Sequence, residues 1–270
     1  MLITTFRAAI LAMVAAATIA LVPQPAFAQP TQGQYLCGSN TAKTFARFIG
    51  RKSKCVQRCV THARTSSQTY SDCFFPFGGT TAKCITDPVK GAEARARASI
   101  VSRCSDAADC PDCYGLGVCT TGEPFVSNVE SELDLFSSVL VYCVEGTGAT
   151  ASRPEAACED AVSRAVVKLG ESRIRCYTRC FAGIFARSCP TCTTGQLPAG
   201  SCDPPVSDPG TAACIAKAEA TTKAVIDASC SAAGANPACY VANGLDTGAA
   251  WVSLFGGAID GQVPNVACNL

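Results

Sequence analysis

Apolar and polar residues follow a helical period in three stretches of the first half of the chain. The first stretch, from Ser39 to about Thr61, places its large apolar residues within about 100° of one another around a helix: Phe45, Phe48, Ile49 and Val56. A second helix should start near Asp87-Pro88, a favourable cap and first turn, and run to Cys104. A third helical stretch runs from Phe125 to Leu140. A strand is an alternative for Ser138 to Val144, because this segment is rich in branched residues.

The second half of the chain repeats this design. The first helix recurs around four apolar residues: Val166, Leu169, Tyr177 and Phe181. The second recurs as Thr211 to Cys230, and the third, in a shorter form, as Trp251 to Ile259. The pattern therefore predicts a mainly α fold of about three helices in each half, joined by irregular loops.

The spacing of the cysteines supports an internal repeat. Cys37, Cys55 and Cys59 recur 121 residues later, and the Cys104/Cys113 pair recurs 126 residues later, at these positions: Cys158, Cys176, Cys180, Cys230 and Cys239. Cys143 and Cys268 close the two copies. We infer two tandem disulfide-stapled units at 37–143 and 158–268, with a linker at 144–157.

The repeat makes predictions about the disulfides. An antiparallel pairing of the first two helices in each copy would bring Cys37 to Cys104 and Cys158 to Cys230. Each copy contains ten cysteines, an even number, so we expect every bridge to form within a copy and each copy to fold alone. The main disulfide candidates are Cys37, Cys104, Cys113, Cys143, Cys158, Cys230, Cys239 and Cys268.

The beginning of the chain resembles a cleavable secretory signal at residues 1–28. Arg7 precedes an apolar run from Ala8 to Val22, and Pro23 to Ala28 supplies a small-x-small cleavage site. The high cysteine content is typical of an oxidising compartment. We therefore expect a secreted or periplasmic protein with no membrane span after cleavage.

Composition excludes several kinds of active site. His62 is the only histidine, so a centre with two or three histidine ligands cannot form within one chain, and no haem-attachment sequence is present. Without Arg7, the basic and acidic residues balance, so a charged partner must be recognised by a local patch. We expect no enzymatic activity and no cofactor.

A basic stripe lies beside the apolar face of the first helix in each copy. Its residues fall within about 80° of helix surface and are possible contacts for an anionic partner: Lys43, Arg47, Arg51, Lys54, Arg58, Arg164, Lys168, Arg175 and Arg179. Such a partner would be an anionic extracellular or cell-surface ligand, although a solvated helix face would give the same pattern.

Two other activities depend on cysteine pairs. Cys110-Pro111-Asp112-Cys113 and Cys189-Pro190-Thr191-Cys192 have the spacing of a thiol-disulfide exchange site or a zinc knuckle, but a loop follows each. Cysteines four apart, at 55/59 and 176/180, could bind Cu(I) as thiolates. Structural disulfides account for all of these pairs more simply.

The combination of Cys37, Lys54-Cys55 and Cys59 with Lys217 to Ala220 and Cys230 resembles cysteine-rich helical repeats in exported proteins of unknown function from environmental bacteria. This resemblance implies the architecture and no particular activity. The sequence therefore predicts a non-enzymatic exported binding or structural module. A thiolate Cu/Zn-binding protein and a thiol-disulfide exchange protein are the alternatives.

Overall fold

The structure is a computed structural model that describes residues 31–66, 69–123, 125–188, 201–232 and 234–267. Every regular element in these ranges is helical, and they contain no strand, which confirms the predicted mainly α fold. The signal sequence expected at residues 1–28 lies outside the described residues. Among the described helices, none is both long and apolar enough to cross a bilayer.

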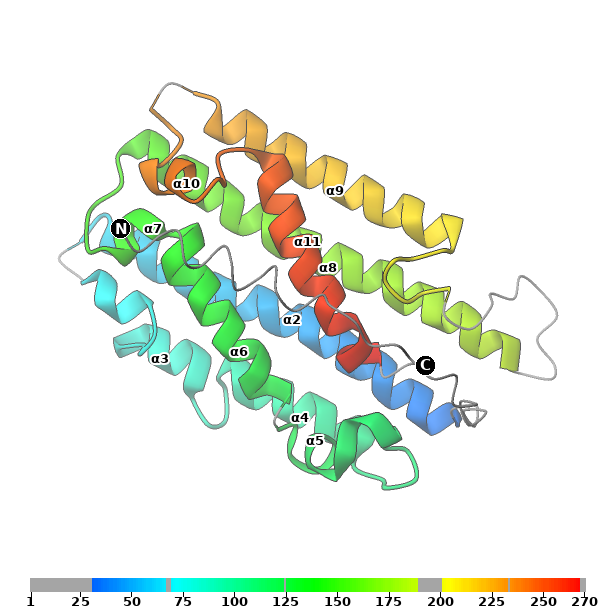
Figure 1. Ribbon diagram of the computed structural model, residues 1–270. Helices are drawn as coiled ribbons and strands as arrows, with labels where there is room; N and C mark the ends of the chain where they lie inside the picture. The colour runs from blue at the N-terminus through cyan, green and yellow to red at the C-terminus, as the bar shows by residue number, and fades with distance from the viewer. Residues whose placement is uncertain (1–30, 67–68, 124, 189–200, 233, 268–270) are drawn as a thin grey trace, which may run out of the picture.

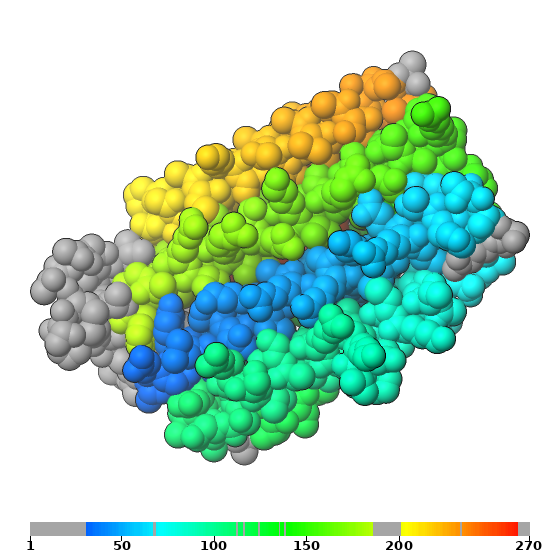
Figure 2. Space-filling model, turned by 180° about the vertical axis from the view of Figure 1, so that it is seen from behind, coloured from blue at the N-terminus to red at the C-terminus, as the bar shows by residue number. Residues whose placement is uncertain are grey.

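Four long helices form one layer, and two others cross it (Figure 1). The layer contains, in spatial order, α9 (Pro209–Cys230), α8 (Arg153–Ser188), α2 (Gln32–Ala63) and α4 (Ala92–Cys104). On one face of this layer lie α6 (Phe125–Leu135) and α11 (Gly248–Ala267). Shorter helices and turns complete the fold: Tyr70–Cys73, α3 (Gly79–Thr86), Asp112–Tyr114, α5 (Gly115–Thr121), Phe136–Val141, α7 (Cys143–Gly146) and α10 (Ala238–Ala242). The other face of the layer exposes α2 and α8 side by side (Figure 2).

Local sequence explains where the long helices begin. Thr31 and Gln34 form a reciprocal capping box at the start of α2, where each side chain accepts from the backbone N–H of the other residue. Asp208 caps α9 by accepting from the N–H of Thr211, and Pro209 occupies the first helical position.

The two halves of the chain share their apolar core. One cluster joins Val56 of α2, Leu169 of α8 and Trp251 of α11, and a second joins Phe45 of α2 with Ile174 of α8. The first helix of each half therefore packs directly on the other. A third, smaller cluster, which includes Tyr177, Phe181 and Ile215, lies within the second half alone.

Three disulfides in each half connect equivalent positions. They are Cys37–Cys104, Cys55–Cys84 and Cys59–Cys73 in the first half, and Cys158–Cys230, Cys176–Cys214 and Cys180–Cys202 in the second. The pairs Cys37–Cys104 and Cys158–Cys230 agree with the predicted antiparallel pairing of helices.

The expectation that every bridge forms within a copy is wrong. Cys143 of the first half is bonded to Cys239 of the second. An even cysteine count is compatible with any pairing, and here the shared core brings α7 against α10. Cys268 lies outside the described residues.

Two predicted elements differ from the structure. The second helix begins at Ala92 and not near Asp87, because the Asp87 carboxylate accepts from the N–H groups of Val89 and Lys90 and closes a turn. The strand considered at Ser138 to Val144 is wrong, since Phe136–Val141 forms a π-helical turn followed by α7.

The segment predicted as a linker, 144–157, contains most of α7 and the first turn of α8. Its Glu145 is buried, and Arg64 at the end of α2 donates a hydrogen bond to that carboxylate at 2.6 Å. This segment therefore packs on the helices that it joins.

Candidate functional site: the basic face of α2 and α8

All nine residues of the predicted basic stripes are exposed. Since α6 and α11 cover the opposite face of the layer, the exposed residues of α2 and α8 belong to the face where these two helices run side by side (Figures 1 and 2). From Lys43 to Arg58 on α2, and from Arg164 to Arg179 on α8, every well-exposed residue is one of these nine. The structure thus joins two stripes, predicted separately, into one face, which we call the basic face.

The two helices are antiparallel. Tyr35, near the start of α2, stacks on Phe185, near the end of α8, with ring centroids 4.2 Å apart. At the middle of the line of contact between the two helices, here called the seam, a Cβ on Gly50 would lie 2.8 Å from Oε1 of Glu171, so Gly50 leaves room for that side chain. The antiparallel arrangement places Lys54 and Arg58 toward the end of the seam where α8 begins.

A groove of about 500 Å³ opens between the helices at the other end of the seam. Four basic residues of the stripes line it: Lys43, Arg47, Arg175 and Arg179. The hydroxyl-bearing residues Tyr35, Ser39 and Thr178 also line it, together with Glu171. Burial raises the pKa of the Tyr35 hydroxyl, and a hydrogen bond with Ser39 opposes that effect. The Tyr35 hydroxyl therefore stays protonated at neutral pH.

None of the nine stripe residues forms an ion pair within the part of the chain that the structure describes. A solvated face balanced by neighbouring carboxylates would show such pairs. Because charges of one sign that lie within a Debye length reinforce one another, the basic face carries a local positive potential on a nearly neutral protein.

Two other basic residues, one in each half, are buried and paired, and the sequence analysis did not single them out. Lys52 lies 2.9 Å from Glu130 and 2.7 Å from Asp134, and it is almost completely buried. Arg173, which occupies the same position in the second copy, pairs with Glu219 and Asp260. These cations connect the first helix of each half to α6 or α11. Their positions, off the stripes and shared by both copies, were the available signal.

Arg64 holds three acidic side chains at the junction of the halves. Its guanidinium donates to Glu145 at 2.6 Å, to Glu159 at 2.8 Å and to Asp160 at 3.0 Å. Glu145 and Glu159 are buried. This cluster therefore serves to join α2, α7 and α8.

The described cysteines are all in disulfides, Cys113 included. Cys110 pairs with Cys119 and not with Cys113, so the first Cys-Pro-x-Cys sequence does not close on itself as an exchange site would. The second, at Cys189 and Cys192, lies outside the described residues.

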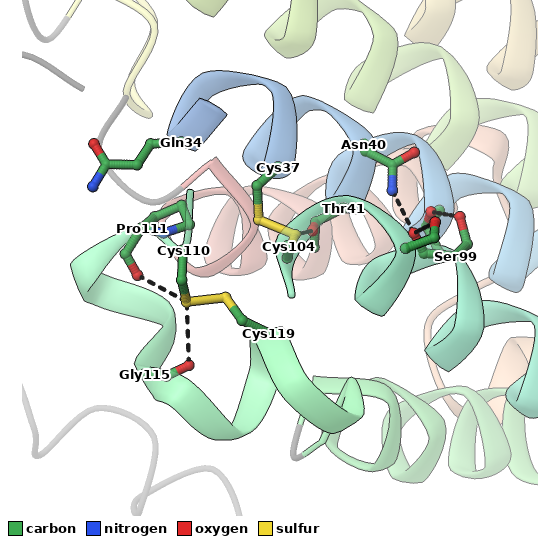
Figure 3. Close-up of a disulfide and its surroundings, with 12 residues drawn as sticks. Gln34, Cys37, Asn40, Thr41, Ser99, Cys104, Cys110, Pro111, Gly115 and Cys119 are labelled. Atoms are coloured by element: carbon green, nitrogen blue, oxygen red, sulfur yellow. Dashed lines mark hydrogen bonds between the residues drawn. A yellow bond between two sulfur atoms is a disulfide. The ribbon is translucent and has the colours of Figure 1, made fainter. Parts of the chain in front are cut away.

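The closest grouping of sulfur atoms is structural (Figure 3). The Sγ atoms of Cys37, Cys104 and Cys119 lie within 4.8 Å of one another, where two disulfides pack side by side. The cysteine pairs considered for Cu(I), Cys55/Cys59 and Cys176/Cys180, bond to four other cysteines. A disulfide sulfur is not a thiolate, so metal binding at any of these cysteines would first require reduction.

His62 lies exposed in the last turn of α2, where its Nδ1 is 3.2 Å from the Ser66 hydroxyl.

Comparison of the chain with protein-family models, curated proteins and solved structures gave no match. The resemblance to exported helical repeats stays a prediction. Function must therefore be inferred from the molecule itself, and its most distinctive surface is the basic face of α2 and α8.

Proposed function

We propose that the chain is an exported, non-enzymatic binding protein whose basic face docks an anionic ligand. One observation carries this proposal: over 16 residues of each of two adjacent helices, every well-exposed side chain is a lysine or arginine that forms no ion pair with a described residue. Clustered like charges repel one another, and a bound anion would relieve that repulsion, which favours a ligand for this face.

The dimensions of the face favour an extended ligand. Lys43 and Arg58 are 15 residues apart, which corresponds to roughly 22 Å along a helix. The second stripe runs beside the first in the opposite direction. A ligand with several negative groups along its length could contact bases of both helices, whereas a single small anion could engage only a few of them.

The disulfide scaffold supports this role. Bridges fix both helices, Cys55–Cys84 and Cys59–Cys73 on α2 and Cys176–Cys214 on α8, close to the stripes. A rigid helix pair holds its charged groups in place before the ligand arrives, which reduces the entropy lost on binding.

Retention on a sulfopropyl matrix tests the proposal. The wild type should bind and elute only with salt, because salt screens exposed charges. The variant Arg47→Glu/Arg58→Glu/Lys168→Glu/Arg179→Glu should elute in the starting buffer.

A control variant makes the same charge change elsewhere. Lys90, Arg95, Arg103 and Lys217 are exposed and lie outside α2 and α8, and their replacement by glutamate should reduce retention much less. Circular dichroism and mass under non-reducing conditions should show that both variants fold and form their disulfides. Equal loss of retention in both variants would show that total charge, and not the basic face, is responsible.

A further inference from the structure

The groove between the start of α2 and the end of α8 contains one acidic side chain among its basic ones. Of the described residues that line it, Lys43, Arg47, Arg175 and Arg179 are basic, and Glu171 alone is acidic. A carboxylate there weakens the attraction for any anion. Attraction of an anion, which explains the basic stripes, therefore does not explain why Glu171 lies in the groove.

Glu171 is positioned in the seam and is not neutralised. Its Oε1 lies against Gly50 of the facing helix, in space that a Cβ would fill. It forms no ion pair with a described residue, although four basic residues line the same groove. Its oxygens are therefore available to accept hydrogen bonds from a ligand.

Hydroxyl groups add further hydrogen-bonding capacity. The Thr178 hydroxyl donates to the carbonyl of Ile174 at 2.7 Å, which leaves its oxygen free to accept. Tyr35 and Ser39 line the groove beside it. The groove thus offers cations for negative groups and, next to them, acceptors for hydroxyl donors.

The opposite end of the seam lacks this combination. The 121-residue shift aligns Ser39 with Asp160 and Tyr35 with Ala156. Asp160 pairs with Arg64 at 3.0 Å, so a bulky ion pair occupies the place of the small serine. Among the described residues, this combination of side chains therefore occurs at one end of the contact between α2 and α8 and not at the other.

We propose that this groove binds a sugar residue of an acidic polysaccharide, with Glu171 accepting from sugar hydroxyls and the four bases pairing with carboxylates. A polyuronate carries both kinds of group on every residue, which matches a carboxylate surrounded by cations. The inference rests on the proposed function, since it names the ligand class of the same face.

Other polyanions fit the surface less well. Single-stranded nucleic acids are bound through exposed aromatic rings, and the one ring that lines the groove, Tyr35, stacks on Phe185. Membrane-surface helices insert an apolar side, but of the most exposed large apolar residues described, only Leu36 lies on α2 or α8.

The variant Glu171→Gln separates the two proposals, because it should change retention on the cation-exchange matrix and affinity for the sugar ligand in opposite directions. Removing a negative charge should strengthen retention of the full chain on sulfopropyl matrix. The same change should weaken binding to oligogalacturonate by about tenfold in calorimetry, since a hydrogen bond to a charged acceptor is lost. Glu132→Gln, an exposed glutamate on α6, is the matched control and should alter neither strongly.

Each outcome decides one of the proposals. Equal or tighter oligogalacturonate binding by Glu171→Gln would overturn the sugar site and leave the basic face intact. Wild-type chain that is retained on the matrix and binds single-stranded DNA or anionic vesicles, but not oligogalacturonate, would also overturn it. Failure of the wild type to bind the matrix would remove the proposed function itself.

Discussion

At the scale of single residues, burial changes the protonation of two carboxyl groups, one beside Arg64 and one beside Arg97. Burial, and then the neighbouring Glu145, raise the pKa of Glu159 to about 9. On the other side of α2, burial and then Glu130 raise the pKa of Glu93 to about 7, against the opposing effect of Arg97. At neutral pH Glu159 therefore keeps its proton, which lets two carboxyl groups share one guanidinium.

These raised pKa values predict how stability depends on pH. An unfolded glutamate titrates near pH 4.3, so between that pH and the folded pKa the native state binds more protons than the unfolded state. The free energy of unfolding should fall as pH rises from about 5 to 9. Urea titrations across this range should show it, and Glu159→Gln should flatten the decline. A curve for Glu159→Gln as steep as that of the wild type would contradict the assignment.

Arg64 should be among the residues most sensitive to substitution. Arg64→Leu leaves Glu145 and Glu159 buried without their cation, and breaking a buried pair from one side typically destabilises by about 3–5 kcal/mol. Arg58→Leu, an exposed residue on the same helix, should change the free energy of unfolding by less than about 0.5 kcal/mol. Chemical denaturation measures both, and similar values would show that the cluster contributes little.

The exposed bases could be predicted from the sequence, but the buried ones could not. Helical period places Lys43 and Arg47 on the solvent side whatever surrounds them, since the apolar face must turn inward. Lys52 falls within that inward face, and only the approach of Glu130 and Asp134 from α6 makes its burial possible. The sequence of one helix does not show which carboxylates another helix will bring against it.

At the scale of secondary structure elements, the sequence predicts that the long helices exist more accurately than it predicts where each one begins and ends. The period fixes α9 to within two residues of the predicted start, because Asp208 and Pro209 mark it locally. The branched residues near Val141 favour a strand by propensity. Packing prevails there: the N–H of Tyr142 donates to the carbonyl of Ser137, and Phe136 packs on Phe255.

The disulfide between the halves makes a prediction about a second one. The repeat aligns Cys113 with Cys239 and Cys143 with Cys268. Since Cys239 bonds to Cys143, and Cys113 is itself disulfide-bonded, the alignment predicts a Cys113–Cys268 bridge. Peptide mapping without reduction should recover both bridges. A Cys113 peptide linked to Cys189 or Cys192 would show that the correspondence ends before the last helix.

At the scale of the whole molecule, the shared clusters predict that the halves fold as one unit. Apolar residues of α2, α8 and α11 contribute to the same clusters, so a separated half would expose the surface that the other covers. This outcome could not be read from the repeat, because a duplicated sequence specifies similar units without specifying whether they share a core.

Separate expression of 29–146 and 157–270 should therefore give chains that are not protease-resistant. The control is the full chain with a protease site inserted at the turn near Gly148, which adopts a positive φ. After cleavage, the Cys143–Cys239 bridge should hold the pieces together and the helical content should persist. A stable, helical half on its own would contradict the shared core.

The groove at one end of the seam also gives the basic face a polarity. Two antiparallel stripes alone are nearly equivalent under a half-turn, so a polymer could lie on them in either sense. Glu171 and Ser39 remove that equivalence, because the opposite end carries Asp160 and Arg64 instead. A chain with chemically distinct ends would then bind in a single orientation, and the protein would distinguish the reducing end of a glycan from the other.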